Sequence, residues 1–344
     1  MHLSEFDYEL PSELIAQQPL AERDASRMLV VDRATRTWTD SSFKNFVDYL
    51  RADDVVVVNN SRVIPARLKG RREETGGQVE IFLVREVESK VWDALVRPGG
   101  RLRKHSRVVF ADGELAAEII DDPGFELRRV RFICEGSFDE LLAGIGITPL
   151  PPYIKRPVDT SATDRERYQT VYAKQRGAIA APTAGLHFTP AVLAQIKERA
   201  TLVEITLHVG YGTFEPVRVD DVDQHTVSAE HYELSQTAVD KINNAKQRAG
   251  RIIVVGTTTM RALESNATEK GEIHAGAGEA TLTIKPGYKF RVADALLTNF
   301  HLPQSSLLIL VSAFAGRDFI LNTYRHAVDE RYRFYSYGDC MLIL

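Results

Sequence analysis

The chain has 344 residues, 44% of them hydrophobic, and a formal net charge of −4. This length exceeds what a single compact core usually organises, so two domains are expected. Its only cysteines, Cys134 and Cys340, are too few for a disulfide framework and have no paired metal-ligand spacing, which suits a reducing cytosol.

The first segment, MHLSEFDYELPSELIAQQPL, has acidic residues where a signal peptide has a basic flank and an apolar run. No later stretch approaches the ~18 continuous apolar residues of a membrane span. We therefore expect a cytoplasmic protein without a membrane partner.

Residues 61–135 are typical of short strands separated by glycine-rich and proline-containing turns. No segment of this region has the apolar spacing of a helix. The six strand candidates are RVIPARLKGR, QVEIFLVREV, VWDALVR, RVVFAD, ELAAEII and FELRRVRFI. Closely spaced strands with small connections favour a compact antiparallel barrel or sandwich, inserted in another domain.

The same region is basic. Between Ser61 and Arg107 there are twelve Lys and Arg residues against six Asp and Glu, and RPGGRLRKHSR has five positive charges and no negative one. A solvated loop is the usual explanation of such a cluster, and a polyanionic partner is the alternative. The candidates for contact with a polyanion are Arg97, Arg101, Arg103 and Lys104.

The flanking sequence is typical of an α/β layer. Buried strands are expected at 55–60, 201–210, 251–256 and 339–344, and helices at 137–145, 164–175, 190–200, 237–250 and 317–334. Segment 305–316 is ambiguous between strand and helix. The predicted fold is a discontinuous α/β layered domain, formed by residues 1–60 and 151–344, with an inserted antiparallel six-stranded β-barrel domain at 61–150.

The segment APTAGLHFTP precedes one of these helices. Thr189 is a good N-cap and Pro190 suits the first helical position, so a helix is expected to begin at Pro190. His187 then lies two residues before the cap, where free backbone N–H groups can attract an anion or a carboxylate. Thr183, Gly185 and Phe188 belong to the same candidate site.

A second candidate segment is LHVGYGTFEPV, at the end of the predicted strand 201–210. Strand ends are the ligand-binding edge of open α/β sheets. A lone histidine there is more often structural. However, His208 lies within a few residues of a carboxylate, a phenol and two glycines, and this grouping favours a role in ligand binding or catalysis. The residues singled out are His208, Tyr211, Gly212, Thr213, Phe214 and Glu215.

Two further turns also carry polar residues that are candidates for ligand binding. In GTTTMRALES, Thr257 and Thr258 are explained either as helix caps or as an anion site beside Arg261, and Arg261 with Glu264 also fits a surface pair. In LTNFHLPQSS, helix capping explains Pro303 and Ser305 but leaves the polar residues Asn299 and His301 unexplained. No metal-ligand spacing emerges, so no metal is expected.

Taken together, AGLHFT, LHVGYGTFEPV, GTTTMRALES and LTNFHLPQSSLLILVSAFAG closely resemble signature segments of the S-adenosylmethionine:tRNA ribosyltransferase-isomerase family of queuosine biosynthesis. FDYELPSELIAQQPLAERDASRMLVVDR and VVVVNNSRVIPARLKG resemble that family too. The resemblance covers nearly the whole chain.

The resemblance implies an enzyme that moves the ribosyl part of S-adenosylmethionine onto 7-aminomethyl-7-deazaguanine at the tRNA wobble position. Adenine and methionine leave, and epoxyqueuosine-tRNA forms. It also implies an α/β domain interrupted by a β-barrel.

Residue roles follow as hypotheses. We expect His187, His208, Glu215 and His301 to take part in catalysis, with turnover lost and little stability lost when His187 or Glu215 becomes Ala. Phe188, Tyr211, Phe214 and Phe300 are candidates for stacking on a base, although core packing explains at least half of them. A monomer is favoured.

Two other functions remain open from the residues alone. An ordinary methyltransferase would use the same S-adenosylmethionine, but the glycine-rich loop after the first strand is missing. A non-catalytic RNA-binding module would account for the basic strands, but not for the polar strand ends in the other domain.

Overall fold

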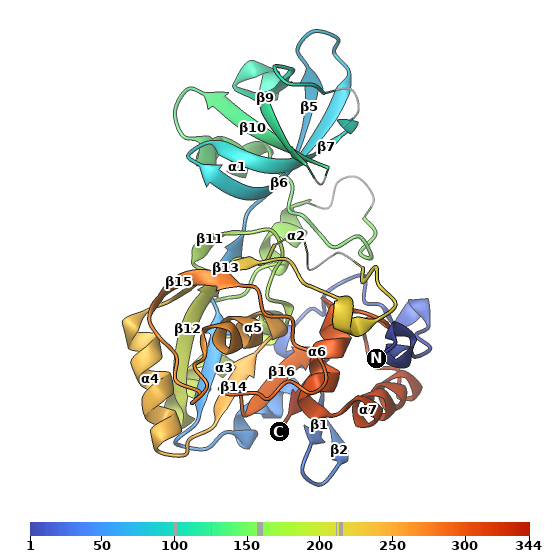
Figure 1. Cartoon of the computed structure of the whole chain (residues 1–344), viewed down its shortest axis with the longest axis vertical. Coiled ribbons are helices and arrows are strands. Elements are labelled where there is room, and N and C mark those ends of the chain that lie inside the picture. Colours follow the sequence, from blue (N-terminus) through green and yellow to red (C-terminus); the bar gives the residue numbers. More distant parts are fainter. Residues whose placement is uncertain (100–101, 125, 157–160, 211, 213–215) are drawn as a thin grey trace.

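The structure is a computed structural model that describes residues 1–99, 102–124, 126–156, 161–210, 212 and 216–344 (Figure 1). Its described residues form a large mixed sheet, a closed barrel and a two-stranded sheet. The order across the large sheet is β15 (Gly276–Ala280), β13 (Glu230–Leu234), β12 (Thr201–Leu207), β3 (Val55–Asn59), β14 (Ile252–Val255), β16 (Ala295–Asn299), β17 (Cys340–Ile343), β1 (Arg27–Asp32) and β2 (Thr37–Ser42).

The centre of this sheet is parallel. Strands β12, β3, β14 and β16 run in one direction, whereas β17 is antiparallel to β16. The carboxyl ends of the four parallel strands therefore open at the same edge, which is where ligands bind in such sheets.

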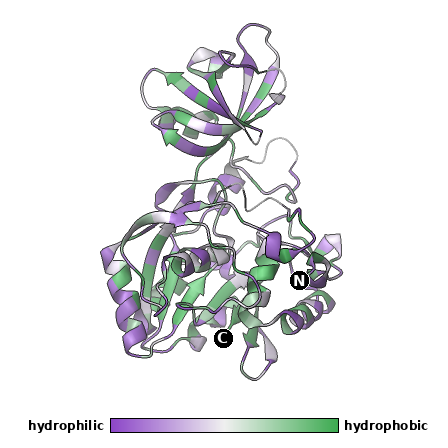
Figure 2. Cartoon of the chain, in the orientation of Figure 1, coloured by the Kyte–Doolittle hydropathy of each residue, from purple (hydrophilic) through white to green (hydrophobic). Residues whose placement is uncertain are grey.

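Both faces of the sheet are buried, which explains the run of four valines in β3. Val55 and Val57 point into one hydrophobic core, and Val56 and Val58 point into another, because successive side chains in a strand alternate between faces. Residues of α4, α5, α6 and α7 complete the first core, and residues of α3 and the 3-10 helix η4 complete the second. Figure 2 shows the resulting hydrophobic centre of this domain.

Most helices lie where N-cap residues and the spacing of apolar residues predict them. Thr189 accepts a hydrogen bond from the Val192 N–H at 3.2 Å and Pro190 begins α3, as predicted. The ambiguous segment 305–316 is a helix, α6, whose N-cap is Ser305. The α-helices in the described part of the chain are α1 (Phe138–Ile145), α2 (Ser161–Arg167), α3 (Pro190–Arg199), α4 (Gln236–Gln247), α5 (Thr257–Asn266), α6 (Ser306–Ala315) and α7 (Arg317–Asp329).

Short 3-10 helices connect the other elements. Those described are η1 (Leu3–Phe6), η2 (Ser12–Leu14), η3 (Arg23–Ala25), η4 (Phe43–Tyr49), η6 (Ala111–Gly113), η7 (Thr183–His187) and η9 (Val222–Gln224). No single described helix is long and apolar enough to cross a bilayer; α6 and α7 meet the length and hydropathy criteria only as a pair, bent by 115°.

The prediction of a helix over 164–175 is wrong beyond its first turn. Helix α2 ends at Arg167, and Tyr168 and Tyr172 are buried in different hydrophobic clusters rather than on one helical face. The following residues form β11 (Gln175–Ala178), which pairs in parallel with β4 (Ser61–Val63). Strand pairing with a distant segment therefore overrides the local helical spacing.

The six predicted barrel strands are confirmed. They close in the order β10 (Leu127–Cys134), β7 (Val91–Arg97), β6 (Gln78–Glu88), β5 (Arg67–Arg72), β8 (Arg107–Phe110) and β9 (Leu115–Gly124). Their neighbouring strands pair antiparallel around a separate hydrophobic core that also buries Phe138 and Leu142 of α1. Figure 1 shows the barrel at one end of the molecule, with β11 between it and the large sheet.

Candidate active site

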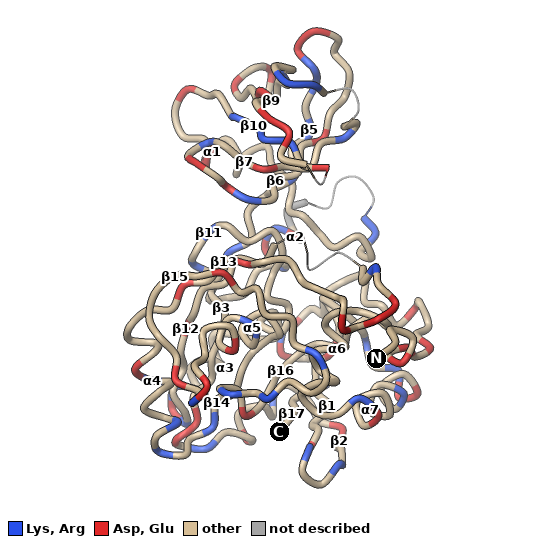
Figure 3. Tube along the Cα trace, viewed as in Figure 1, with Lys and Arg blue, Asp and Glu red and all other residues tan. Residues whose placement is uncertain are grey.

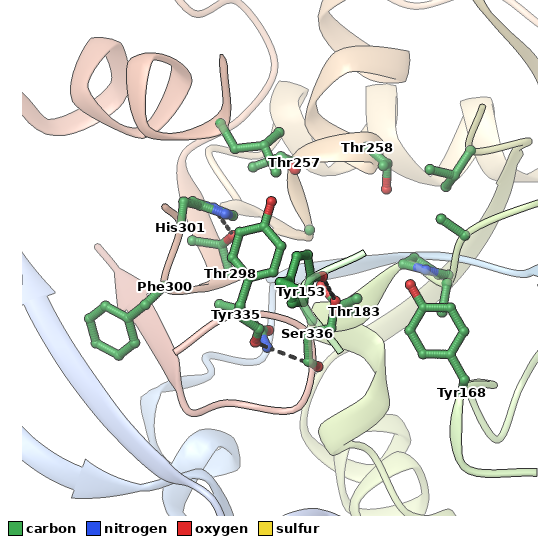
Figure 4. Close-up of a pocket in the computed structure, with 18 residues that line it drawn as sticks. Tyr153, Tyr168, Thr183, Thr257, Thr258, Thr298, Phe300, His301, Tyr335 and Ser336 are labelled. Carbon is green, nitrogen blue, oxygen red and sulfur yellow. Dashed lines mark hydrogen bonds between the residues drawn. The ribbon is translucent and has the colours of Figure 1, made fainter. Parts of the chain in front are cut away.

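Segments at the carboxyl ends of β12, β14 and β16 meet around one pocket of about 560 Å³, which we call pocket A (Figure 4). The predicted candidates Thr183, Thr257, Thr258, Asn299 and His301 line it. Among the described residues, its lining contains no Asp, Glu, Lys or Arg. Other lining residues are Tyr153, Tyr168, Val209, Phe300, Tyr335 and Ser336.

Helix α5 begins at this pocket directly after β14. Its N-cap is Gly256, whose φ of 88° allows the sharp turn and which supplies no side-chain cap. Thr257 is only 6% exposed, and the buried hydroxyl of Thr258 has no hydrogen-bond partner among the described residues. The helix therefore presents uncapped polar groups to the pocket.

His301 follows β16 and is held from several sides. Its Nε2 lies 3.0 Å from the Thr298 hydroxyl, and its backbone carbonyl accepts a hydrogen bond from the Tyr8 hydroxyl at 2.5 Å. Burial lowers the pKa of His301 to about 3. The imidazole is therefore neutral at physiological pH and faces pocket A as a hydrogen-bonding group.

His187 does not line pocket A but lies directly behind it. Its Nδ1 is 2.8 Å from the Ser26 hydroxyl, and its Nε2 is 3.2 Å from Asn299 Oδ1. Asn299 uses its amide nitrogen to donate to the carbonyl oxygens of Tyr335 at 2.8 Å and Ser336 at 3.4 Å. His187 therefore orients Asn299, and Asn299 holds the backbone of the Tyr335–Ser336 turn.

This network fixes the protonation state of His187. Since the Asn299 amide donates to two carbonyls, its oxygen faces His187, so the imidazole carries its proton on Nε2 and accepts from Ser26 at Nδ1. Burial lowers the pKa of His187 to about 4. Both ring nitrogens are thus occupied, which favours a positioning role over proton transfer.

A second, larger pocket adjoins the first, and we call it pocket B. It has an empty volume of about 1200 Å³ and shares Tyr153, Leu307 and Tyr335 with pocket A. Tyr335 has a φ of 74°, an unusual conformation for a bulky residue that often marks a functional site. Apolar residues form much of the wall of pocket B, including Leu282, Ile284, Leu302 and Leu310.

Arg261 lies at pocket B rather than at pocket A. Its guanidinium donates to Glu230 Oε2 at 2.6 Å and to the carbonyls of Ser228 and Ala280. Both side chains of this ion pair are at least 90% buried. The pair joins α5 to β13, and these bonds favour a structural role for Arg261.

Glu264 lines neither pocket. Its carboxylate accepts hydrogen bonds from the Tyr288 hydroxyl and from the backbone N–H groups of residues 291, 292 and 293, at 2.9–3.0 Å. It is 2% exposed. This placement favours an anchor between α5 and the segment that leads into β16.

Three other candidates lie in packed surroundings. Phe188 is fully buried and packs edge-on against Phe43 and Phe46. A side chain at Gly185 would collide with the Tyr172 hydroxyl. His208 is half-buried, lies against Gly177 and has its pKa lowered by burial, and it does not line pocket A.

The remaining candidates divide into described and undescribed residues. Gly212 lines pocket B, whereas Tyr211, Thr213, Phe214, Glu215 and Arg101 lie outside the described residues. Arg97, Arg103 and Lys104 are exposed on the barrel and form no ion pair with a described residue. Figure 3 shows that Lys and Arg on the barrel are interspersed with Asp and Glu.

Sequence reasoning missed the aromatic wall of pocket A. Tyr153 donates or accepts a hydrogen bond with the Ser336 hydroxyl, and its ring meets that of Tyr335 edge to face. Tyr168 lies across the pocket (Figure 4). These tyrosines come from segments without a motif. Only Tyr335 lies in the tyrosine-rich C-terminal segment, and the sequence offered no signal for Tyr153 and Tyr168.

Within the described part of the chain, no three side chains of the His, Cys, Asp and Glu types gather closely enough to hold a metal ion.

Comparison with known proteins identifies the family. The family model "Queuosine biosynthesis protein" matches residues 3–343. S-adenosylmethionine:tRNA ribosyltransferase-isomerase of Pelotomaculum thermopropionicum is 50% identical over the full length of both chains. The crystal structure of S-adenosylmethionine tRNA ribosyltransferase from Thermotoga maritima is 37% identical, with a TM-score of 0.57 over 99% of this chain and 100% of that one. This chain therefore belongs to the queuosine biosynthesis protein family, and it is an enzyme of the transferase class.

Proposed function

We propose that this enzyme transfers and isomerises the ribosyl part of S-adenosylmethionine onto 7-aminomethyl-7-deazaguanine at the wobble position of tRNA. The products are epoxyqueuosine-tRNA, adenine and methionine. The observation that carries this proposal is pocket A, where the carboxyl ends of three parallel strands of the large mixed sheet meet beside a second pocket. Two adjoining pockets suit a reaction between two substrates.

The chemistry sets three requirements, and the described residues of pocket A support two of them, a hydrogen-bonding group for adenine and a neutral amine. A sulfonium acidifies the adjacent C5′–H, the departing adenine needs a hydrogen-bond donor, and the aminomethyl nitrogen must be neutral to attack. His301 is neutral and faces the pocket, so it supplies a hydrogen-bonding group without adding charge. A lining without ionised side chains among the described residues also favours the neutral amine.

The aromatic side chains support binding of bases. Tyr153 and Tyr335 lie between pockets A and B, where a ring can stack on adenine from one side or on an extruded wobble base from the other. Asn299, held by His187, fixes the backbone of Tyr335. We therefore assign His187 to positioning, and His301, Thr257 and Thr258 to contact with S-adenosylmethionine.

The barrel supplies a surface for the anticodon arm. Arg97, Arg103 and Lys104 are exposed and unpaired with any described acidic residue, and unpaired cations attract the phosphate backbone. Arg97 also lines a hollow of about 1700 Å³ on the barrel, together with Lys69 and Arg71.

One incubation tests the proposal. The purified enzyme is mixed with S-adenosylmethionine and tRNA that carries 7-aminomethyl-7-deazaguanine, and the nucleosides and small products are separated by mass spectrometry. Free adenine, methionine and epoxyqueuosine in equal amounts are expected. Formation of S-adenosylhomocysteine and a methylated nucleoside would instead show a methyltransferase and refute the proposal.

A further inference from the structure

The first turn of α5 leaves backbone donors unused inside pocket A. The first hydrogen bond of this helix runs from the Met260 N–H to the Gly256 carbonyl. The N–H groups of Thr257, Thr258 and Thr259 have no acceptor among the described residues, and Gly256 supplies no side-chain cap. Such groups, at the positive end of a ten-residue helix, form a potential anion site.

Two hydroxyl groups point to a ligand at the same place. Thr257 is 94% buried, since only 6% of it is exposed, yet no described residue bonds to its hydroxyl. The Thr258 hydroxyl is also buried and without a described partner. By contrast, Thr259 in the same turn donates to the Val255 carbonyl at 2.7 Å. Figure 4 shows Thr257 and Thr258 on one side of the pocket and Tyr335, Tyr153 and Tyr168 across it.

We infer that this first turn of α5 is a carboxylate subsite, and that it takes the α-carboxylate in the methionine part of S-adenosylmethionine. The inference rests on the function proposed above. It adds the orientation of the donor, because the carboxylate fixes the methionine end at α5 and directs the sulfonium and the ribose toward the rest of pocket A.

The neutrality of the lining favours a carboxylate over a tRNA phosphate. Phosphates of nucleic acids are usually held by Lys and Arg, and the described lining of pocket A has neither. S-adenosylmethionine carries its own ammonium and sulfonium charges beside the carboxylate. Its anion therefore needs hydrogen-bond donors rather than a cationic side chain.

The shape of the turn also leaves room for the ligand. A side chain built on Gly256 would meet only Thr258 Oγ1 at 3.7 Å and Ala184 Cβ at 3.8 Å. The facing segment contributes the small residues Ala181 and Ala184 to the lining. A carboxylate can thus approach the N–H groups of the first turn without displacing a bulky side chain.

The test compares two donors that differ only in this carboxylate. Adenine release from S-adenosylmethionine and from decarboxylated S-adenosylmethionine is measured with the tRNA substrate for the wild-type enzyme, Thr257→Val and Thr258→Val. Valine keeps the shape of threonine and removes the hydroxyl. Each variant is expected to lose about tenfold in kcat/KM for S-adenosylmethionine and less than about twofold for the decarboxylated donor, with tRNA affinity unchanged.

A matched control and a rescue separate binding from folding. Thr237 is the exposed second residue of α4 as Thr258 is the second residue of α5, so Thr237→Val should leave both donors unaffected. Thr258→Ser should restore most of the selectivity. An equal loss for both donors would overturn the inference, and so would a loss of tRNA affinity with the preference between donors retained. Failure of the proposed function itself is distinguishable, because the wild-type enzyme would then release no adenine from either donor.

Discussion

At the scale of single residues, His187 shows how burial changes the meaning of a motif. The sequence places it before a helix N-terminus, where a ligand contact is plausible. In the structure both of its ring nitrogens are occupied by Ser26 and Asn299, and its contribution to pocket A passes through Asn299. The sequence-based expectation that His187→Ala costs little stability does not take this burial into account.

Replacing His187 by Ala should therefore reduce both stability and turnover. The change leaves a cavity and an unsatisfied Ser26–Asn299 pair, so a loss of about 2–4 kcal/mol in the free energy of unfolding is expected, measured by urea denaturation. His187→Gln, which can accept from Ser26 and donate to Asn299, should recover part of both. The exposed His274→Ala is the control. Full stability together with lost turnover would return His187 to a direct catalytic role.

Stability should also depend on pH through His187 and His301. Their pKa values are lowered to about 4 and about 3, so the folded state resists protonation that the unfolded chain accepts below pH 6.5. The stabilisation is complete above pH 6.5 and is lost as pH falls, by about 2 kcal/mol for each histidine at pH 5. The difference in unfolding free energy between pH 7 and pH 5 should shrink by that amount in His187→Gln. An unchanged difference would show that His187 protonates freely in the folded protein.

At the scale of elements, the first turns of α5 combine two duties. Thr257 and Thr258 face pocket A, whereas Arg261 and Glu264 hold the same helix to neighbouring segments. From the sequence alone, Arg261 and Glu264 could also form an exposed ion pair with each other on the helix surface. Their partners are instead Glu230 for Arg261, and Tyr288 with three backbone N–H groups for Glu264.

Glu264→Gln tests this division. The amide loses the charge that accepts four hydrogen bonds in a buried site, so the free energy of unfolding should fall by about 2–4 kcal/mol. The KM for S-adenosylmethionine, measured well below the melting temperature, should stay within about twofold, because Glu264 does not line pocket A. The exposed Glu269→Gln is the matched control. A raised KM with normal stability would place Glu264 in the binding site.

At the scale of the whole molecule, the barrel stands apart from the sheet and carries cations without described acidic partners. Neutralising Arg97, Arg103 and Lys104 to Gln should weaken tRNA binding and reduce the salt dependence of log Kd by up to about three, near one for each lost phosphate contact. Filter binding over a range of salt concentrations measures both quantities. The charge-matched control neutralises the exposed Lys197, Lys241 and Arg248 of the other domain. Equal effects of the two triple variants would assign the barrel cations to solvent.

Local patterns in the chain predicted the elements that depend on neighbours in sequence. Strand β3 with its run of four valines, the Thr189–Pro190 start of α3 and the six barrel strands were all predicted, because apolar runs, capping and turn chemistry act over a few residues. Edge strand β15 was missed, since its glycine-rich sequence has no strand pattern and it is fixed by pairing with β13.

The sequence by itself determined the family, the inserted barrel and most of the motifs whose residues line pocket A. Only the tertiary structure decided that His187 reaches Asn299, 112 residues further along the chain, and that Tyr153, Tyr168 and Tyr335 form the opposite wall. The physical reason is that these contacts follow from the order of strands in the sheet. That order is set by burial of both sheet faces over the whole chain, which no local segment encodes.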